Sequence, residues 1–292
     1  MTETKKPERT IAFQGALGAY SDLACRRVFP AMTTLPCAAF EDAFAAVREG
    51  RAALAMLPIE NSVAGRVADI HHLMPDSGLF IIGEHFERVS HHLLALPGAR
   101  LDQIRTVRSH VHALSQCRNF IRAQGLTPVV RADTAGSAAE IKELGDKTIA
   151  AIASELAGEI YGLVSLKQNI EDAEHNTTRF LVMSGEPERA PRGGPTVTTF
   201  VFNVKNVPAA LYKGLGGFAT NGVNMTKLES YMVGGNFTAT QFYADVEAHP
   251  DDRPLALALE ELEFFSTEVK ILGVYPAHRL RIAAREEEKG ES

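Results

Sequence analysis

The sequence has no tryptophan, only three cysteines among its 292 residues, and no long hydrophobic run. Cys25, Cys37 and Cys117 are too few and too far apart for a disulfide framework or a Cys-x-x-Cys zinc site, so we expect reduced thiols. No apolar stretch approaches the roughly 20 residues that span a bilayer, and the first ten residues lack the apolar core of a secretory signal. We therefore expect a cytoplasmic protein with no membrane partner.

An excess of positive charge is also absent. The formal net charge is −6 and the pI is about 5.9, which argues against general nucleic-acid binding, because that needs clustered Lys and Arg. An anionic substrate would need local positive groups. The composition, 45% hydrophobic and 23% charged, is that of a globular protein, and 292 residues favour two domains over one.

Neither the histidines nor the glycines form a cofactor motif. Each of three histidine pairs has only one close partner and no neighbouring cysteine cluster, so we expect structural or surface histidines and no metal. The pairs are His71-His72, His91-His92, and His110 with His112. Gly15 and Gly18 lack the third glycine of a dinucleotide fingerprint, so we expect no nucleotide cofactor.

The first two thirds of the chain alternates short apolar runs with amphipathic segments, which is typical of βα units on a mainly parallel sheet. The expected strands are residues 11–13, 53–57, 80–82, 91–96, 106–108, 148–152 and 179–183. The expected helices are residues 21–29, 40–49, 113–124, 134–144 and 154–161, with Ser21 and Ser154 as capping residues.

A stretch rich in glycine, proline and charge, residues 184–195, predicts a linker and a domain boundary. Six segments follow it, at residues 197–204, 209–220, 224–232, 238–247, 254–265 and 269–275. Their β-α-β-β-α-β order is that of a ferredoxin-like domain. Residues 279–292 are highly charged, and we expect them to be frayed.

The chemistry is concentrated in a polar run that turns abruptly into an apolar strand, residues 176–183. Thr178 and Arg179 therefore lie at the mouth of a strand, where open α/β sheets bind ligands. Taken alone, the same run also fits a helix-to-strand turn with a capping threonine and a surface arginine.

Other segments occur in a specific order around this run. They are residues 11–21, 57–65, 133–139, 208–212 and 224–230. Together they resemble the bacterial prephenate dehydratases, and the resemblance extends from about Arg9 to His278. It implies an α/β catalytic domain with two lobes like those of periplasmic binding proteins, followed by a ferredoxin-like (βαββαβ) ACT regulatory domain. The expected boundaries are residues 10–184, 185–195 for the linker, and 196–278.

The resemblance also implies the reaction and its residues. The substrate would be prephenate, converted to phenylpyruvate in the cleft between the lobes without cofactor or metal. Thr178 matches the essential threonine of the family and would donate a hydrogen bond to the departing oxygen, while Arg179 either holds a substrate carboxylate or braces the cleft. The expected substrate-binding residues are Tyr20, Ser21, Glu60, Asn61, Ser62, Thr134, Ser137 and Phe180.

For the second domain, the resemblance implies feedback inhibition by L-phenylalanine at an interface between protomers. The expected effector-binding residues are Ala209, Ala210, Leu211, Asn224, Glu229 and Ser230. Ala209 replaces a usual glycine, and Tyr231-Met232 replaces a usual Arg-Pro pair, so we expect a weakened or altered response. We also expect a homodimer or homotetramer in which alternate residues of the first strand, Val197, Thr199 and Val201, face a partner.

Two alternatives stay open at the level of sequence. An arogenate dehydratase would share every catalytic feature and accept an amino group in place of the keto group. A non-catalytic amino-acid sensor would use the same cleft only for binding, although Thr178 in the expected position disfavours it.

Overall fold

The computed structural model describes residues 7–232 and 239–290 of a mixed α/β protein. The chain divides into two compact units. The first contains the residues up to Ile70 together with His85–Phe180, and the second contains His71–Glu84 together with the chain from Leu181 onward. Two strands, β5 (Phe80–Arg88) and β11 (Thr177–Ser184), contribute residues to both units. The domain boundaries at residues 10–184, 185–195 and 196–278 stay a prediction.

The first lobe of unit 1 is built on three parallel strands, with β1 (Thr10–Gln14) between β2 (Thr33–Cys37) and β3 (Leu54–Asn61). Strand β1 is apolar on both faces and buried, as expected for a parallel strand covered on both sides. This lobe also contains η1 (Pro7–Arg9), α1 (Tyr20–Val28), α2 (Phe40–Arg48), β4 (Gly65–Arg66) and the first half of α3 (Ala68–Leu73), whose residues from His71 onward belong to unit 2. Strand β4 pairs antiparallel with the end of β3.

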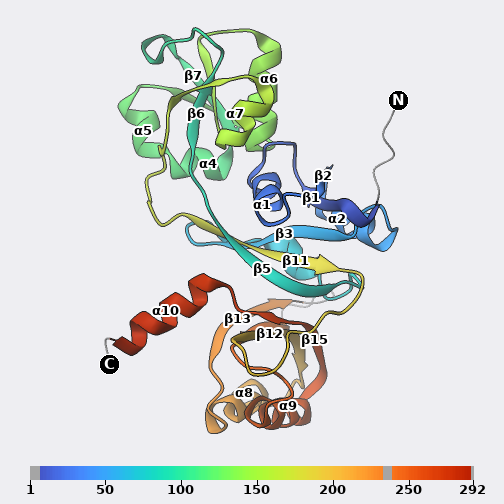
Figure 1. Ribbon diagram of the computed structural model, residues 1–292. Helices are drawn as coiled ribbons and strands as arrows, with labels where there is room; N and C mark the ends of the chain where they lie inside the picture. The colour runs from blue at the N-terminus through green and yellow to red at the C-terminus, as the bar shows by residue number, and fades with distance from the viewer. Residues whose placement is uncertain (1–6, 233–238, 291–292) are drawn as a thin grey trace. The chain divides into compact units, whose positions relative to one another are not determined.

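The second lobe of unit 1 is a three-layer sandwich around a five-stranded sheet of order β10-β6-β9-β7-β8 (Figure 1). Its strands are β6 (His92–Ala95), β7 (Thr106–His110), β8 (Thr127–Arg131), β9 (Ile149–Ala153) and β10 (Val164–Lys167). Its helices are η2 (Leu101–Gln103), α4 (Val111–Gln116), α5 (Arg118–Ala123), α6 (Thr134–Leu144) and α7 (Glu155–Tyr161). One face of the sheet packs on α4 and α5 and the other on α6 and α7, because successive strand residues point to opposite faces.

A close backbone approach joins the two lobes. Gly18 adopts a φ of +88°, and a Cβ there would lie 2.7 Å from the Cα of Ala157. Its carbonyl accepts a hydrogen bond from the Ser154 hydroxyl at 2.5 Å. Ser154 also accepts the N–H of Ala157, which confirms it as the N-cap of α7. The expected cap Ser21 is wrong, since α1 begins one residue earlier and Asp22 accepts the Gly18 N–H instead.

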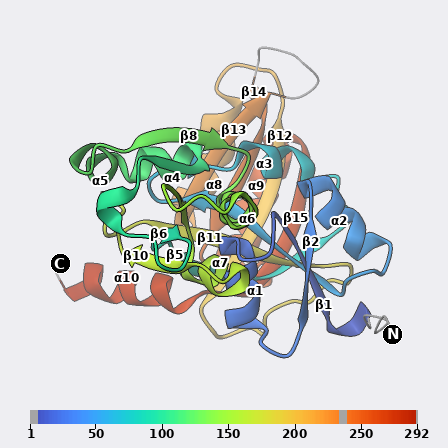
Figure 2. The same ribbon diagram turned by 90° about the horizontal axis from the view of Figure 1, so that it is seen from above.

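Unit 2 contains the expected order of elements on an antiparallel sheet (Figure 2). The elements are β12 (Thr196–Val204), α8 (Ala210–Thr220), β13 (Met225–Met232), β14 (Ala239–Val246), α9 (Arg253–Phe265), β15 (Ser266–Pro276) and α10 (Arg279–Gly290). The strand order β13-β14-β12-β15 places β12 in the interior of the sheet. Its residues Phe200 and Phe202 pack with α8 and α9 in one apolar core.

Two sequence-based expectations about unit 2 are wrong. Val197, Thr199 and Val201 do not face a partner, because they are 0%, 0% and 2% exposed within the chain itself. The opposite face of this sheet is covered by the segment His71–Glu84, with the His71 ring 5.0 Å from that of Tyr243. The expectation that the residues after 278 are frayed is also wrong, because Arg279–Gly290 form the helix α10. Within the described ranges, no helix is long and apolar enough to cross a membrane.

Ala209 is strained at the start of α8. It adopts φ 63° and ψ 16°, the left-handed region that glycine occupies without cost. A Cβ in this region costs an L-residue roughly 1–2 kcal/mol. The alanine therefore lowers the stability of the turn that leads into α8.

We predict that Ala209→Gly raises the free energy of unfolding by about 1 kcal/mol, because the relief of strain exceeds the added backbone entropy of the unfolded chain. Denaturant unfolding with an unchanged m-value would measure it. Ala219→Gly in the same helix is the matched control and should lower stability by about 0.5–1 kcal/mol. A loss of stability in both variants would contradict the strain argument.

Candidate active site

A cavity of about 620 Å³ lies in unit 1, and both lobes contribute to its walls. The first lobe supplies the turn before α1 and the segment that follows β3. The second lobe supplies the ends of β7 and β8, and β11 supplies Thr178 and Phe180. Of the sequence-predicted residues, those that line the cavity are Tyr20, Ser21, Asn61, Thr134, Thr178 and Phe180. Glu60, Ser62, Ser137 and Arg179 do not.

The hydroxyl of Thr178 accepts a hydrogen bond from the side-chain amide of Asn61, with Nδ2 and Oγ1 2.9 Å apart. The oxygen of the same amide accepts the backbone N–H groups of Val63 and Ala64, at 3.0 and 2.8 Å. Among the residues that the structure describes, no acceptor is paired with the hydroxyl of Thr178. Because Asn61 donates to Oγ1, the proton of Thr178 is left to point at a molecule in the cavity.

Three further side chains extend this contact into a network. Asn176 accepts from Asn61 Nδ2 at 2.8 Å and donates from its own Nδ2 to Gln116 Oε1 at 3.0 Å. Gln116 Oε1 also lies 2.9 Å from His91 Nε2. Asn176 is 1% exposed and His91 2%, so each polar group needs the partners it has.

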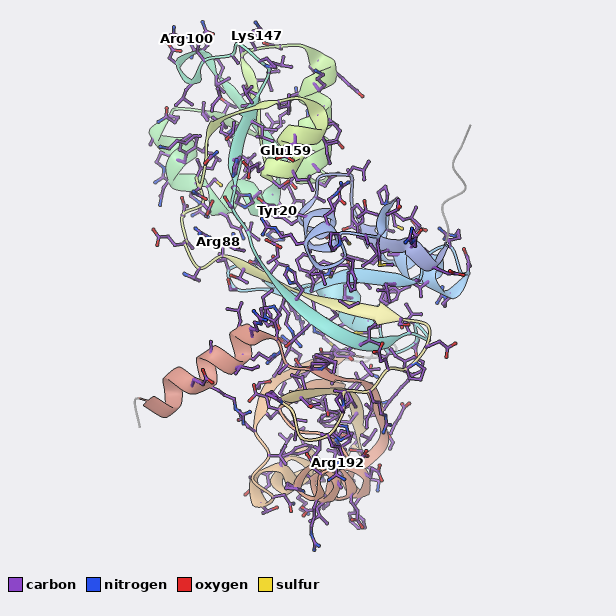
Figure 3. The ribbon with its side chains drawn as sticks, in the orientation of Figure 1. Tyr20, Arg88, Arg100, Lys147, Glu159 and Arg192 are labelled. Atoms are coloured by element: carbon purple, nitrogen blue, oxygen red, sulfur yellow. The ribbon has the colours of Figure 1, made fainter. Side chains whose placement is uncertain are left out.

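Tyr20 ends the network on the far side of His91. Its hydroxyl lies 2.9 Å from His91 Nδ1 and donates to the Ser90 carbonyl at 2.7 Å. The side chain comes from the start of α1, as Figure 3 shows, and its ring lines the cavity. Burial raises the pKa of this hydroxyl well above its usual value. Its hydrogen-bonding groups face protein atoms, which leaves the ring to contact a ligand.

Sequence reasoning missed Gln116, Asn176 and the part played by His91. Asn176 adjoins the Thr178 motif and could have been included on that ground. His91 was noted only as one of a pair and was expected to be structural or on the surface. Nothing in the pattern around Gln116 distinguishes it from any polar residue on a short helix, because its partners are distant in sequence.

Arg179 points away from the cavity. Its side chain is 2% exposed, and its Nη1 donates to Glu60 Oε1 at 2.9 Å. The two residues sit on neighbouring strands β11 and β3, so their ion pair ties the strand ends that carry Thr178 and Asn61. A guanidinium that is buried in this pair cannot also hold a ligand in the cavity, which favours the bracing role over the substrate clamp.

Ser62 and Ser137 also stabilise the walls rather than line them. Ser62 Oγ donates to the His175 carbonyl at 2.8 Å and accepts the Thr177 N–H at 2.9 Å, which joins the end of β3 to the start of β11. Ser137 donates to the Asp133 carbonyl at 2.7 Å inside α6. Both act on the elements that present cavity residues.

The cavity is suited to an anion although the protein is acidic. Three helices of nine, nine and eleven residues, α1, α2 and α6, begin with Tyr20, Phe40 and Thr134, all of which line it. The N-terminus of a helix carries a partial positive charge and free N–H groups. Burial lowers the pKa of His91 and His110, so the attraction for an anion comes from these helix ends and from Arg66, which also lines the cavity, and it is opposed by the carboxylates of Asp69 and Asp133 in the same lining.

The described residues contain no group of three His, Cys, Asp or Glu side chains that could hold a metal ion. The effector-binding candidates lie in unit 2. Asn224 lines a second cavity of about 270 Å³ together with Glu247 and Arg285. The other candidates do not line it: Ala209, Ala210 and Leu211 lie at the start of α8, and Glu229 and Ser230 lie on β13, an outer strand of the sheet.

Fold and site together define an α/β protein with a cavity walled by two lobes and a hydroxyl donor at a strand mouth. A family model for prephenate dehydratase matches residues 11–188. That match covers more than half of the chain, so the protein belongs to the prephenate dehydratase family, a family of lyase-type dehydratases.

Individual relatives agree with this assignment. A Komagataeibacter europaeus protein named bifunctional N-acyl-homoserine lactone acylase/prephenate dehydratase is 58% identical over 94% of this chain and 98% of its own. The Arabidopsis thaliana arogenate dehydratase/prephenate dehydratase 1 is 37% identical over 93% of this chain and 73% of its own.

Solved structures are similar along nearly the whole chain. The prephenate dehydratase of Arthrobacter aurescens in complex with L-Phe has a TM-score of 0.84 at 33% identity, over 92% of this chain and 90% of its own. GqqA, named a quorum quenching acylase, has a TM-score of 0.88 at 57% identity, over 94% of this chain and all of its own.

We predict that Arg179→Lys lowers the free energy of unfolding by about 1.5–3 kcal/mol, because an ammonium cannot reproduce a hydrogen-bonded guanidinium fork at a buried site. Denaturant unfolding measures the loss. Arg118→Lys is the matched control at an exposed arginine of the same unit and should change stability by less than about 0.5 kcal/mol. Equal stability of the two variants would contradict the bracing role of Arg179.

Proposed function

We propose that this chain is a prephenate dehydratase of L-phenylalanine biosynthesis that converts prephenate to phenylpyruvate. In this reaction the ring carboxylate leaves as CO₂, and the electron pair of the broken C–C bond enters the ring. The ring C–O bond breaks, and the departing hydroxide takes a proton to leave as water. Aromatisation of the ring supplies the driving force, so the protein must orient the carboxylate and assist the leaving oxygen.

The observation that carries the proposal is the hydrogen bonding of Thr178. Its oxygen accepts from Asn61 at 2.9 Å, and its proton is available to the cavity. A donor placed where negative charge develops stabilises the transition state more than the ground state. As the proton of Thr178 moves toward the leaving oxygen, the N–H of Asn61 stabilises the charge that grows on Oγ1.

The walls of the cavity supply the remaining requirements. The N-termini of α1, α2 and α6 and the side chain of Arg66 favour a substrate with two carboxylates. The ring of Tyr20 provides apolar surface for the substrate ring, and Phe180, which is 1% exposed, forms part of the wall behind it. Arg179 and Glu60 act from behind the wall, by holding together the strand ends that present Thr178 and Asn61.

Arogenate is a second candidate substrate. It carries an ammonium group in place of the keto group of prephenate, and plant relatives such as the Arabidopsis protein have both substrates in their names. Two carboxylates, Asp69 and Asp133, line the cavity and favour an ammonium group. The proposed chemistry at Thr178 is the same for both substrates.

Hydrolysis of the amide bond of an N-acyl-homoserine lactone is a second candidate activity. It is favoured by the 58% identity to a relative named for both activities and by the similarity to GqqA. The test is the release of homoserine lactone from a purified preparation. Parallel loss of both activities in Thr178→Val would place them in one site.

The experiment that tests the main proposal is an assay of the purified full chain with prephenate and with arogenate, before and after treatment with a chelator. We expect phenylpyruvate from prephenate and no loss of rate after chelation. A protein that converts neither substrate would favour the alternative of a non-catalytic amino-acid sensor. Activity that needs an added divalent ion would contradict the cofactor-free mechanism.

We predict that Thr178→Val lowers kcat at least about 100-fold, the usual scale for a lost transition-state donor. Thr178→Ser keeps the hydroxyl and should retain part of the rate. Thr177→Val is the matched control, since this neighbouring side chain does not line the cavity, and its kcat should stay within about twofold of the native value. A nearly native kcat in Thr178→Val would remove this residue from the mechanism.

Regulation is proposed for unit 2. Its β-α-β-β-α-β order supports an ACT domain, and the Arthrobacter relative was crystallised with L-Phe. We expect L-phenylalanine to bind near Ala209 and Asn224, in a homodimer or homotetramer, and to inhibit the dehydratase. The backbone N–H groups at the start of α8 would receive the carboxylate of the amino acid.

We predict that Ala209→Gly tightens the binding of L-phenylalanine several-fold, because it removes a methyl group beside the N–H groups that meet the ligand. Calorimetry on the full chain measures the affinity, and Ala219→Gly serves as the control with native affinity. If both variants bind like the native protein, the ligand does not contact the start of α8.

A further inference from the structure

The orientation of one side-chain amide in unit 1 determines the proton positions of its neighbours. The backbone N–H groups of Val63 and Ala64 both donate to the side chain of Asn61, so the atom they meet is its oxygen. Its nitrogen must then face Asn176 and Thr178, and it donates to both. Backbone donors cannot be reversed, so this assignment does not depend on a choice of rotamer.

The same logic continues along the network. Asn176 accepts with its oxygen, so its nitrogen donates to Gln116, and the atom of Gln116 at this position is Oε1. That oxygen lies 2.9 Å from Nε2 of His91. Two acceptors cannot share a contact at this distance. His91 therefore carries a proton on Nε2 and donates it to Gln116.

Tyr20 completes the assignment at the other ring nitrogen. In a neutral ring with a proton on Nε2, Nδ1 has only a lone pair, and the hydroxyl of Tyr20 at 2.9 Å is its donor. The hydroxyl shares its proton between Nδ1 and the Ser90 carbonyl. Burial lowers the pKa of His91, although Gln116 and Glu171, which accepts the backbone N–H of His91 at 2.8 Å, oppose this shift.

We propose that His91 is a positioning residue for Thr178: its ring, which donates from Nε2 to Gln116 and faces the hydroxyl of Tyr20 with Nδ1, holds Gln116 and Asn176 in place, and these two amides support the Asn61 amide whose orientation the backbone N–H groups set. The proposal rests on the dehydratase function. His91 lines the cavity wall but acts on the reaction through the amide of Gln116. Without this donor, the Gln116 amide keeps only its contact with Asn176 Nδ2 at 3.0 Å and a longer one with Asn61 Oδ1 at 3.4 Å, so both amides are held less firmly.

The test is a double-mutant cycle between His91 and Gln116, measured in kcat. His91→Asn cannot reach Gln116, and we expect kcat to fall about tenfold, the loss of one buried hydrogen bond, with a smaller change in KM. In the Gln116→Leu background, the same change should cost less than about twofold. Equal losses in the two backgrounds would show that His91 does not act through Gln116 and would overturn the proposal.

Three controls separate positioning from folding. His91→Gln places an amide N–H near the position of Nε2 and should restore most of the native kcat. Tyr20→Phe keeps the ring but removes the donor to Nδ1. Like His91→Asn, it should lower kcat. His92→Asn makes the same change at the neighbouring buried histidine, whose Nδ1 lies 3.2 Å from the Ser165 hydroxyl outside the network, and kcat should be native.

A spectroscopic measurement decides the tautomer without any substrate. The ¹⁵N signals of His91, assigned by comparison with His91→Gln, should show a protonated Nε2 and an unprotonated Nδ1 near neutral pH. A proton on Nδ1 alone would overturn the proposal even if the enzyme is active. If the tautomer is as expected but the native protein has no activity on prephenate or arogenate, the proposed function fails and the orientation of the network stands.

Discussion

The active-site region depends on one constraint, the contact of two backbone N–H groups with the side chain of Asn61. Because the N–H groups of Val63 and Ala64 belong to the turn after β3, they fix the amide without any contribution from a ligand. The amide nitrogen then has to meet Thr178 and Asn176. Because the backbone fixes the Asn61 amide in advance, the site needs little reorganisation when a substrate enters. Preorganised catalysis requires this.

The fixed Asn61 amide can position Thr178 in the cavity only if the two lobes of unit 1 keep their relative positions. Asn61 and Thr178 come from strand ends in the first lobe, whereas Gln116 and His91 belong to the second. The approach of Gly18 to Ala157 and its bond with Ser154 bring the lobes into contact at one place. The amide network joins them at another. Buried polar networks confer specificity when their members are satisfied, and the side-chain nitrogen and oxygen atoms of the buried residues Asn176 and His91 each have a partner.

The alternation of strands and helices was readable from the sequence because apolar periodicity follows burial. Two of the overlooked strands, β2 and β8, are outer strands of their sheets and contain Pro36 and Pro128, a residue that weakens any strand signal. The overlooked β10 is an outer strand of only four residues, and β4 has two. The expected helix at residues 113–124 is broken at Cys117 into α4 and α5. Thr178 was identified by the resemblance of its segment and of the ordered segments around it to a known family, whereas Gln116 could not be, because its role arises from partners 55 and 60 residues away.

The neutral amides around Thr178 are compatible with the dianionic substrate proposed above. A carboxylate next to Thr178 would repel a dianion, and a lysine or arginine there would bind the substrate and the transition state about equally. Amide groups add no net charge, so attraction is left to the helix ends and Arg66 at the cavity wall. The ion pair of Arg179 with Glu60 lies outside the cavity lining, where its charges stabilise the wall without competing for the ligand.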